Sequence, residues 1–231
     1  FIPDPSVAII LVNWNGYAFT ADCLRSLRGV ELPDFKVILV DNASQNEEGS
    51  RLKNEFPEID LIENSTNLGF AGGNNIGIRK ALEEGYSHVM LLNNDTVVES
   101  DFIGQMLWKF QNNPTLGVVQ PLIFFLHDRK QIWSAGGKWK QVWCRSITRG
   151  DRKYNEQYHA KDRKIDWATG CCMLIFLDYL ICCSCRVSLD SSANGVQRKM
   201  GLFYLLSSSI SSFLYYFFEC SISGDKSYTS R

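Results

Sequence analysis

Apolar residues follow two different spacings along roughly the first 125 residues. Val7 to Val12 is a continuous apolar run typical of a buried strand, and Tyr17 to Leu27 carries apolar residues at helical spacing. The alternation continues, with strands predicted at 36–40, 59–64, 88–93 and 116–120 and helices at 47–56, 74–84 and 101–111. Strands that alternate with helices predict a mainly parallel sheet, and strands that are apolar throughout predict helices on both of its faces.

Polar residues stand at the carboxyl ends of several predicted strands. The first strand runs into Asn13-Trp14-Asn15, the second is followed by Asp41, and the fourth by Asn93-Asn94-Asp95. In open α/β sheets ligands bind outside the carboxyl ends of the strands, so these ends describe one crevice. Asn and Asp also suit turns and helix caps, which is the alternative for each end taken alone.

Two carboxylates in this crevice have a chemistry that suits a nucleotide. Asp41 follows an apolar strand, where it can accept hydrogen bonds from a ribose or a base imino group, and Trp14 offers a flat face nearby. Asp95, beside the amide oxygens of Asn93 and Asn94, supplies hard oxygen ligands for Mg²⁺ or Mn²⁺, to be completed by a diphosphate. The alternative for Asn94 or Asp95 is a cap on the turn that follows.

A glycine-rich stretch, Gly69 to Gly77, leads into the predicted helix 74–84. It matches neither the P-loop nor the G-x-G-x-x-G motif. Glycines ahead of a helix still allow a ligand to approach the backbone closely and leave an N-terminus that attracts anions.

Composition and charge are those of an ordinary soluble globular protein. Of the 231 residues, 45% are apolar and 21% are charged, which suits one domain with a core, or one domain with an appendage. The net charge of −1 gives no overall field that would recruit nucleic acid or an anionic membrane, and we expect no nucleic-acid partner. No basic stretch precedes the first apolar run, so a signal peptide is not expected.

The eight cysteines are unevenly distributed, and five of them lie between 171 and 185. Without a secretory signal we expect reduced thiols. A zinc site built on the CCSC stretch is disfavoured, because neither a second C-x2-C pair nor nearby histidines match it.

Five ordered blocks identify a resemblance that covers about residues 5–177. The blocks read VAIILVNWNG, VILVDNAS, NLGFAGGNNIGI, MLLNNDT and WATGCCMLI. Together they resemble the family 2 glycosyltransferases with the GT-A fold, a Rossmann-like, mainly parallel sheet with helices on both faces. Within that family the blocks are most similar to the rhamnosyltransferase-like branch.

The resemblance implies a role for each matching position. Asn93-Asn94-Asp95 stands in the place of the D-x-D motif, so Asp95, with Asn93, is expected to hold Mg²⁺ or Mn²⁺. The nucleotide-sugar site is expected to comprise Val12, Asn13, Trp14, Asn15, Asp41, Gly72, Gly73, Asn74, Asn93, Asn94, Trp167, Thr169 and Gly170.

The activity that the resemblance implies is an inverting, metal-dependent sugar transfer. The donor is expected to be a nucleotide-diphosphate sugar carried on UDP or dTDP, with dTDP-rhamnose suggested by the branch. The acceptor is expected to be a saccharide or a lipid-linked molecule. Such a reaction predicts a cytoplasmic protein, with peripheral contact at the cytoplasmic face of the membrane as a further expectation.

The last part of the chain departs from the family pattern. Residues 1–177 are expected to form the transferase domain, whereas 178–231 are rich in Ser and Cys. The family's acidic pair, which supplies the general base, is absent where the chain reads SSANGVQRK, and Glu219 is the substitute we consider. Residues 178–231 are either a damaged acceptor-side region or a genuine substitute, whose uncharged stretch 202–218 suits contact with a membrane.

Two other functions remain as alternatives. A nucleotide-sugar-binding remnant without a general base would keep the donor half and lack transfer activity. A nucleotidyltransferase is disfavoured, because the loop after the first strand has no basic residue before Arg25.

Overall fold

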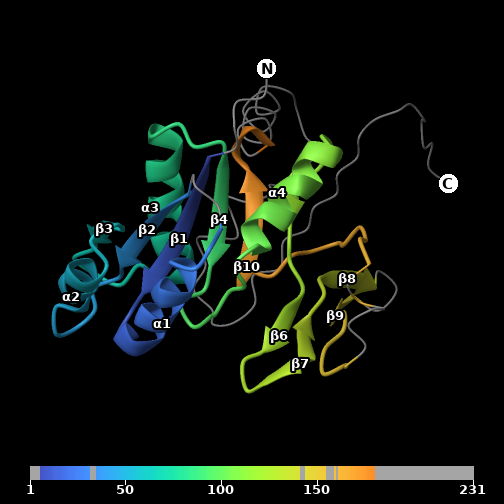
Figure 1. The fold of residues 1–231 in the computed structure, drawn as a ribbon, viewed down its shortest axis with the longest axis horizontal. Coiled ribbons are helices and arrows are strands. Elements are labelled where there is room, and N and C mark those ends of the chain that lie inside the picture. The colour runs from blue at the N-terminus through green and yellow to red at the C-terminus, as the bar shows by residue number, and fades with distance from the viewer. Residues whose placement is uncertain (1–5, 32–34, 141–143, 155–158, 160, 180–231) are drawn as a thin grey trace.

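The computed structural model describes residues 6–31, 35–140, 144–154, 159 and 161–179 (Figure 1). Their centre is a six-stranded sheet with the order β3-β2-β1-β4-β10-β5. The strands are β1 (Val7–Asn13), β2 (Phe35–Asp41), β3 (Asp60–Glu63), β4 (His88–Leu92), β5 (Val118–Val119) and β10 (Cys172–Phe176). The second region expected from the sequence, 178–231, lies outside the described residues apart from its first two positions.

Four strands of the sheet are parallel, as the sequence predicts. β1 pairs in parallel with both β2 and β4, and β2 pairs in parallel with β3. β10 runs antiparallel to β4 on one side and to β5 on the other, so the predicted strand at 116–120 joins the sheet only through β10. The protein is therefore a mixed α/β fold with a mainly parallel sheet, and the predicted fold class is confirmed.

Helices cover both faces of this sheet. Successive residues of each strand point to opposite sides, so each strand contributes side chains to both faces. Ile9 and Leu11 of β1 face α1 (Tyr17–Leu27), α2 (Glu48–Glu55) and α4 (Phe102–Asn112), whereas Ile10 faces α3 (Gly69–Glu83). Each of these three β1 side chains is completely buried. The sheet thus has an apolar core on either side, which explains strands without alternating polar residues.

Helix α3 begins at Gly69, five residues earlier than the start predicted from the sequence. Its glycines lie inside the helix because they let it pack closely on β1. A Cβ built on Gly73 would lie 2.8 Å from Val12 Cγ1, and one on Gly77 would lie 2.6 Å from Ile10 Cγ2. The predicted start of this helix was too late, because glycine has a low helix propensity. Close packing on β1 outweighs that propensity here.

Two small hairpins lie along the chain between β5 and β10, and the sequence pattern does not predict them. They are formed by β6 (Ile123–Phe125) with β7 (Asp128–Ser134) and by β8 (Gly137–Lys140) with β9 (Arg145–Thr148). Figure 1 shows them below α4, beside the central sheet rather than within it. In the part of the chain that the structure describes, no helix has the length and apolar character needed to cross a bilayer.

Candidate functional site

Asn13 and Asp41 lie side by side at the carboxyl ends of β1 and β2. The parallel register pairs them directly, and Asn13 Nδ2 donates a hydrogen bond to Asp41 Oδ1 at 2.8 Å. The backbone N–H of Ser44 donates to Asp41 Oδ2 at 3.0 Å, in a local turn that Asp side chains favour. Asp41 is only 5% exposed, but a carboxylate has about four acceptor positions, so it can accept another hydrogen bond from a ligand.

Glu48 brings a second carboxylate to the same corner from the first turn of α2. Its Oε2 accepts hydrogen bonds from Asn13 Nδ2 at 3.0 Å and from the backbone N–H of Tyr17 at 3.1 Å. Tyr17 opens α1, where the helix dipole favours a negative charge. Glu48 therefore holds the beginnings of both helices against the end of β1.

A chain of hydrogen bonds continues from Asn13 to the loop after β4. Thr20 Oγ1 donates to Asn13 Oδ1 at 2.7 Å, and Asn94 Nδ2 donates to Thr20 Oγ1 at 2.8 Å. Thr20 is completely buried on α1. The chain Asp41–Asn13–Thr20–Asn94, which we call the polar chain, connects the predicted base-binding carboxylate with the predicted metal motif.

The loops after β1 and β2 are fastened to each other. The N–H of Asn15 donates to Ser44 Oγ at 3.0 Å, and the N–H of Gln45 donates to Asn15 Oδ1 at 2.8 Å. Asn15 and Ala43 have φ angles of 51° and 62°, a left-handed conformation that is uncommon for residues other than glycine. The loops hold Trp14 outward with 57% of its surface exposed, so its ring is available to stack on a base or a sugar.

The glycine-rich block lies against β1 and is tied to Asn42. Asn42 Nδ2 donates to Asn67 Oδ1 at 2.7 Å, and Asn42 Oδ1 accepts from the N–H of Leu68 at 3.0 Å. Gly73 and Asn74 are buried in the helix, and Gly73 packs on half-buried Val12. The block thus fixes the wall of the site, whereas contact of Gly72, Gly73 or Asn74 with a nucleoside stays a prediction.

The Asn93-Asn94-Asp95 turn is held by its backbone and leaves Asp95 exposed. The N–H of Asn93 donates to the carbonyl oxygen of Cys171 at 2.8 Å, and Thr96 Oγ1 donates to the carbonyl oxygen of Asn93 at 2.7 Å. The next helix begins only at Phe102, and the amide of Asn94 is engaged with Thr20. The amide nitrogen of Asn94 thus faces α1, and capping of the turn before Val97 by Asn94 or Asp95 stays an alternative.

The predicted segment Trp167 to Gly170 lies next to this turn, through Cys171. Gly137 exchanges two backbone hydrogen bonds here, donating to the Trp167 carbonyl at 3.1 Å and accepting from the Asp166 N–H at 2.8 Å. The Thr169 N–H donates to Gln120 Oε1 at 2.8 Å. Trp167 itself is only 7% exposed, so most of its ring is packed inside the protein.

The oxygen atoms around Asp95 fit a divalent cation as a half-site. The Asp95 carboxylate is exposed, and the neighbouring Asn94 adds an amide oxygen, a donor set suited to Mg²⁺ or Mn²⁺ completed by phosphate and water. The amide oxygen of Asn93 is buried and makes no hydrogen bond among the described residues, so it would have to turn outward to join. Among those residues no group of three His, Cys, Asp or Glu is placed to hold a metal, and Asp95 stays the predicted metal ligand.

Two thiols, those of Cys23 and Cys171, lie close to Asp95, and the thiol of Cys172 lies close to both of them. Burial raises the pKa of Cys23 to about 12, with a hydrogen bond between Cys23 and Thr96 opposing the shift and the Asp95 charge adding to it. Burial followed by the Asp95 charge raises the pKa of Cys171 to about 12, and burial also raises the pKa of Cys172. None of the three forms a disulfide in the described residues, and their reduced state stays a prediction.

Sequence reasoning missed three side chains of this site: Thr20, Ser44 and Glu48. Ser44 was detectable, since it follows Asp41 by three residues in a D-N-A-S stretch of the kind that forms such turns. Thr20 and Glu48 lack a comparable signal, because their contacts join elements that only the folded chain brings together. Glu219, the substitute general base considered from the sequence, lies outside the described residues.

The profile of glycosyl transferase family 2 matches residues 8–183, which is most of the chain. The chain therefore belongs to glycosyl transferase family 2, and the family predicted from the five blocks is confirmed.

Individual relatives match shorter stretches. An uncharacterised protein of Mycobacterium tuberculosis is 47% identical over 58 residues, 24% of this chain and 22% of the relative. The poly-beta-1,6-N-acetyl-D-glucosamine synthase of Staphylococcus epidermidis is 29% identical over 118 residues, 49% of this chain and 27% of the synthase. The matches thus span about a quarter of these two relatives.

Among solved structures, the mannosyltransferase PcManGT of Pyrobaculum calidifontis, in complex with GDP-Man and Mn²⁺, is similar with a TM-score of 0.46. It is 23% identical, and the match covers 54% of this chain and 37% of that protein.

Proposed function

We propose that this protein transfers a sugar, with inversion, from a nucleotide-diphosphate sugar to a saccharide or lipid-linked acceptor, and that it requires Mg²⁺ or Mn²⁺. The observation that carries the proposal is the polar chain, which joins Asp41 to Asn94 along the carboxyl edge of a parallel sheet. This edge is where open α/β sheets bind ligands, and family membership supports sugar transfer as the chemistry.

The donor would lie across this edge. Asp41 would accept a hydrogen bond from the base, with its own position fixed by Asn13 and Ser44. Trp14, which is largely exposed, would stack on a ring of the donor. The diphosphate would then reach Asn94 and Asp95, at the other end of the polar chain.

The reaction breaks the bond between the anomeric carbon and the diphosphate oxygen while the acceptor hydroxyl forms a new bond to that carbon. Asp95, with the neighbouring amide oxygen of Asn94, would hold a divalent ion, which would supply positive charge opposite the departing diphosphate. Asp95 holds its position because the backbone of the turn is fixed to Cys171 and Asn94 is fixed to Thr20. The acceptor proton passes to a general base, and Glu219 stays our candidate for that role.

For the specific donor we propose a UDP- or dTDP-linked sugar, and within that class dTDP-rhamnose. The similarity of the five sequence blocks to the rhamnosyltransferase-like branch supports this choice. We further propose a cytoplasmic location with peripheral contact at the membrane, and a transferase domain that ends near residue 177. Strand β10, which ends at Phe176, is compatible with that boundary.

Calorimetry with UDP, dTDP and GDP, each with and without Mn²⁺, tests the donor site. We expect UDP or dTDP to bind more tightly with Mn²⁺, and Asp95→Ala to abolish the effect of the metal while Asp101→Ala, an exposed carboxylate at the start of α4, retains it. Metal-dependent binding that survives Asp95→Ala would contradict the proposal.

A nucleotide-sugar-binding remnant is the second candidate, since the family's acidic pair is absent from the sequence. Release of UDP or dTDP from the donor, measured with and without acceptor saccharides, separates the two candidates. Turnover that disappears in Glu219→Gln supports transfer, whereas donor binding without any turnover supports the remnant.

A further inference from the structure

Positive charge is concentrated in the part of the chain that contains the two hairpins. Eleven of the 24 Lys and Arg residues, but only five of the 25 Asp and Glu residues, lie between 128 and 166. This segment therefore has a net charge of +6, within a chain whose net charge is −1. Overall charge hides this asymmetry, so the expectation drawn from composition about anionic partners does not apply to this segment.

The register of β8 and β9 gathers part of this charge on one face. Lys140 lies directly opposite Arg145, and Lys138 lies opposite Ile147. Residues two apart in a strand share a face, so these four side chains lie together, and all four are exposed. The other face carries Trp139 and is half-buried or buried. We call the exposed set, Lys138, Lys140, Arg145 and Ile147, the basic face.

The basic face is unfavourable for the isolated fold. Like charges directly opposite each other in antiparallel strands repel, and Lys140 and Arg145 are in that arrangement. Of the ion pairs in the described residues, one reaches this face, from Lys138 Nζ to Asp166 Oδ1 at 3.0 Å. An anionic partner would relieve this repulsion.

Ile147 indicates which kind of anionic partner fits. It is 39% exposed among the three cations. Apolar side chains amid Lys and Arg suit the boundary between lipid headgroups and acyl chains. Against a nucleic-acid backbone or a free phosphate an exposed isoleucine contributes little, so a lipid surface is the better match.

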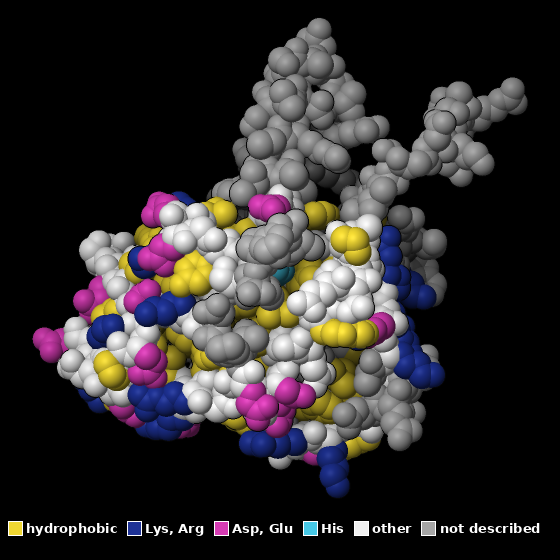
Figure 2. All heavy atoms as spheres, turned by 45° about the horizontal axis from the view of Figure 1, so that its top comes forward, with side chains coloured by type: hydrophobic (Ala, Val, Ile, Leu, Met, Phe, Trp, Pro, Cys, Tyr) yellow, Lys and Arg dark blue, Asp and Glu magenta, His cyan; other side chains and the backbone are white. Residues whose placement is uncertain are grey.

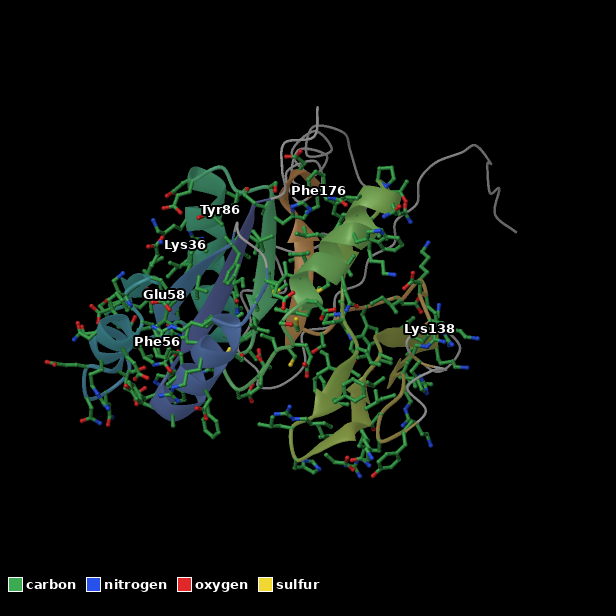
Figure 3. The ribbon with its side chains drawn as sticks, in the orientation of Figure 1. Lys36, Phe56, Glu58, Tyr86, Lys138 and Phe176 are labelled. Carbon is green, nitrogen blue, oxygen red and sulfur yellow. The ribbon has the colours of Figure 1, made fainter. Side chains whose placement is uncertain are left out.

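The space-filling view agrees with this segregation. Figure 2 shows dark blue Lys and Arg along the right flank, where Figure 1 places β8 and β9, with few magenta Asp or Glu among them. The left flank carries both colours intermixed. Figure 3 places Lys138 and Lys36 on opposite flanks, so Lys36 can serve as a control position.

We propose that the basic face binds the surface of an anionic phospholipid bilayer. The three cations attract the headgroups, and Ile147 enters the boundary with the acyl chains. The interaction gives a surface to the membrane contact in the proposed function, on which it rests. It does not involve the polar chain, and it does not depend on whether the protein transfers sugar. It weakens with salt, because exposed charges are screened over about 8 Å at physiological ionic strength.

Co-sedimentation of the full chain with vesicles tests the proposal, without nucleotide or metal. Vesicles of phosphatidylglycerol and phosphatidylcholine are compared with vesicles of phosphatidylcholine alone. The test variant is Lys138→Gln with Lys140→Gln and Arg145→Gln, and the control variant is Lys36→Gln with Arg79→Gln and Lys80→Gln. Both variants remove three positive charges, the second from the opposite flank and from α3.

We expect the wild type to bind the anionic vesicles, and the test variant to bind them about tenfold more weakly or worse, while the control changes less than about twofold. Equal binding by wild type and test variant overturns the proposal, as does an equal loss in the control. Absence of wild-type binding to anionic vesicles overturns it as well. In calorimetry, the test variant is expected to bind UDP with Mn²⁺ as tightly as the wild type does. If the test variant loses UDP binding, the basic face contributes to the donor site, and the proposal is overturned.

Discussion

Asn94 Nδ2 and Thr20 Oγ1 lie 2.8 Å apart, although 74 residues separate them in the sequence. This hydrogen bond joins the loop that carries Asp95 to helix α1, and Thr20 passes the connection on to Asn13. Because Thr20 is completely buried, its hydroxyl has no water to replace these partners. Binding at one end of the polar chain should therefore depend on the other end.

Thr20→Val tests this dependence, since valine has nearly the same shape and no hydroxyl. We expect a loss of stability of about 1–3 kcal/mol, because the buried amide of Asn13 and the partly buried amide of Asn94 each lose a partner. Beyond this loss, we expect the enhancement of UDP binding by Mn²⁺ to shrink, while UDP binding without metal changes less. Thr20→Ser retains the hydroxyl and should restore the enhancement. If the valine variant loses stability alone, Thr20 only supports the fold.

Gly137→Ala should displace Trp167. A Cβ on Gly137 would lie 1.7 Å from Trp167 Cε2, so the indole or the hairpin has to move. We expect a loss of about 1–3 kcal/mol in the free energy of unfolding, together with weaker donor binding. Gly104→Ala on α4 is the control, because nothing lies within 4 Å of its Cβ. Its helix should become slightly more stable, and denaturant unfolding of both variants checks the contrast.

Alkylation should distinguish buried from exposed cysteines. With pKa values of about 12, Cys23 and Cys171 have almost no thiolate at pH 8, and Cys172 is buried as well. Iodoacetamide at pH 8 should therefore modify Cys144, which is exposed, and spare these three until the protein is unfolded. Peptide mass spectrometry reads each site separately. Rapid labelling of Cys171 in the native protein would contradict the packing around Asp95.

Stability should fall in mild acid because of His88. Burial lowers the pKa of His88 to about 4, while the nearby Asp178 opposes the shift. The unfolded chain takes up this proton near pH 6.5 and the folded chain only near pH 4, so stability is lost as the pH falls through this window. The loss is about 3 kcal/mol at most.

His88→Phe removes this titration and keeps a ring beside Phe110 and Phe176, whose centroids lie 5.0 and 5.1 Å from that of His88. Denaturant unfolding at pH 7, 5.5 and 4 should show a weaker pH dependence for His88→Phe than for the wild type. His127→Gln, at an exposed position, should keep the wild-type slope. A wild-type slope in His88→Phe would assign the pH dependence to other groups.

The sequence predicted the parallel strands β1 to β4 well, because the apolar runs that indicate them are local. The bounds of α1 are the predicted ones, and β1, β2 and β4 lie where the apolar runs place them. The carboxyl-edge positions of Asn13, Asp41 and Asp95 follow from those runs alone. Helix α3 was misplaced at its start, because the packing of Gly73 on Val12 cannot be read from glycine propensity.

The positions of β10 and β5 in the sheet could not be predicted in the same way. Strand β10 enters between β4 and β5 after an excursion of two hairpins, and no local pattern states which strands it will join. The basic face was hidden for a related reason. Only the pairing of Lys140 with Arg145 turns scattered charges into one surface.

The late arrival of β10 also constrains how the protein is made. During synthesis, β1 to β4 can pair while the ribosome is still adding the hairpins, but the outer edge of β4 stays open until Cys172–Phe176 emerges. An open apolar edge is a template for pairing with another chain. The nascent protein thus passes through an interval in which aggregation competes with completion of the sheet, and the speed of translation through 93–171 sets the length of that interval.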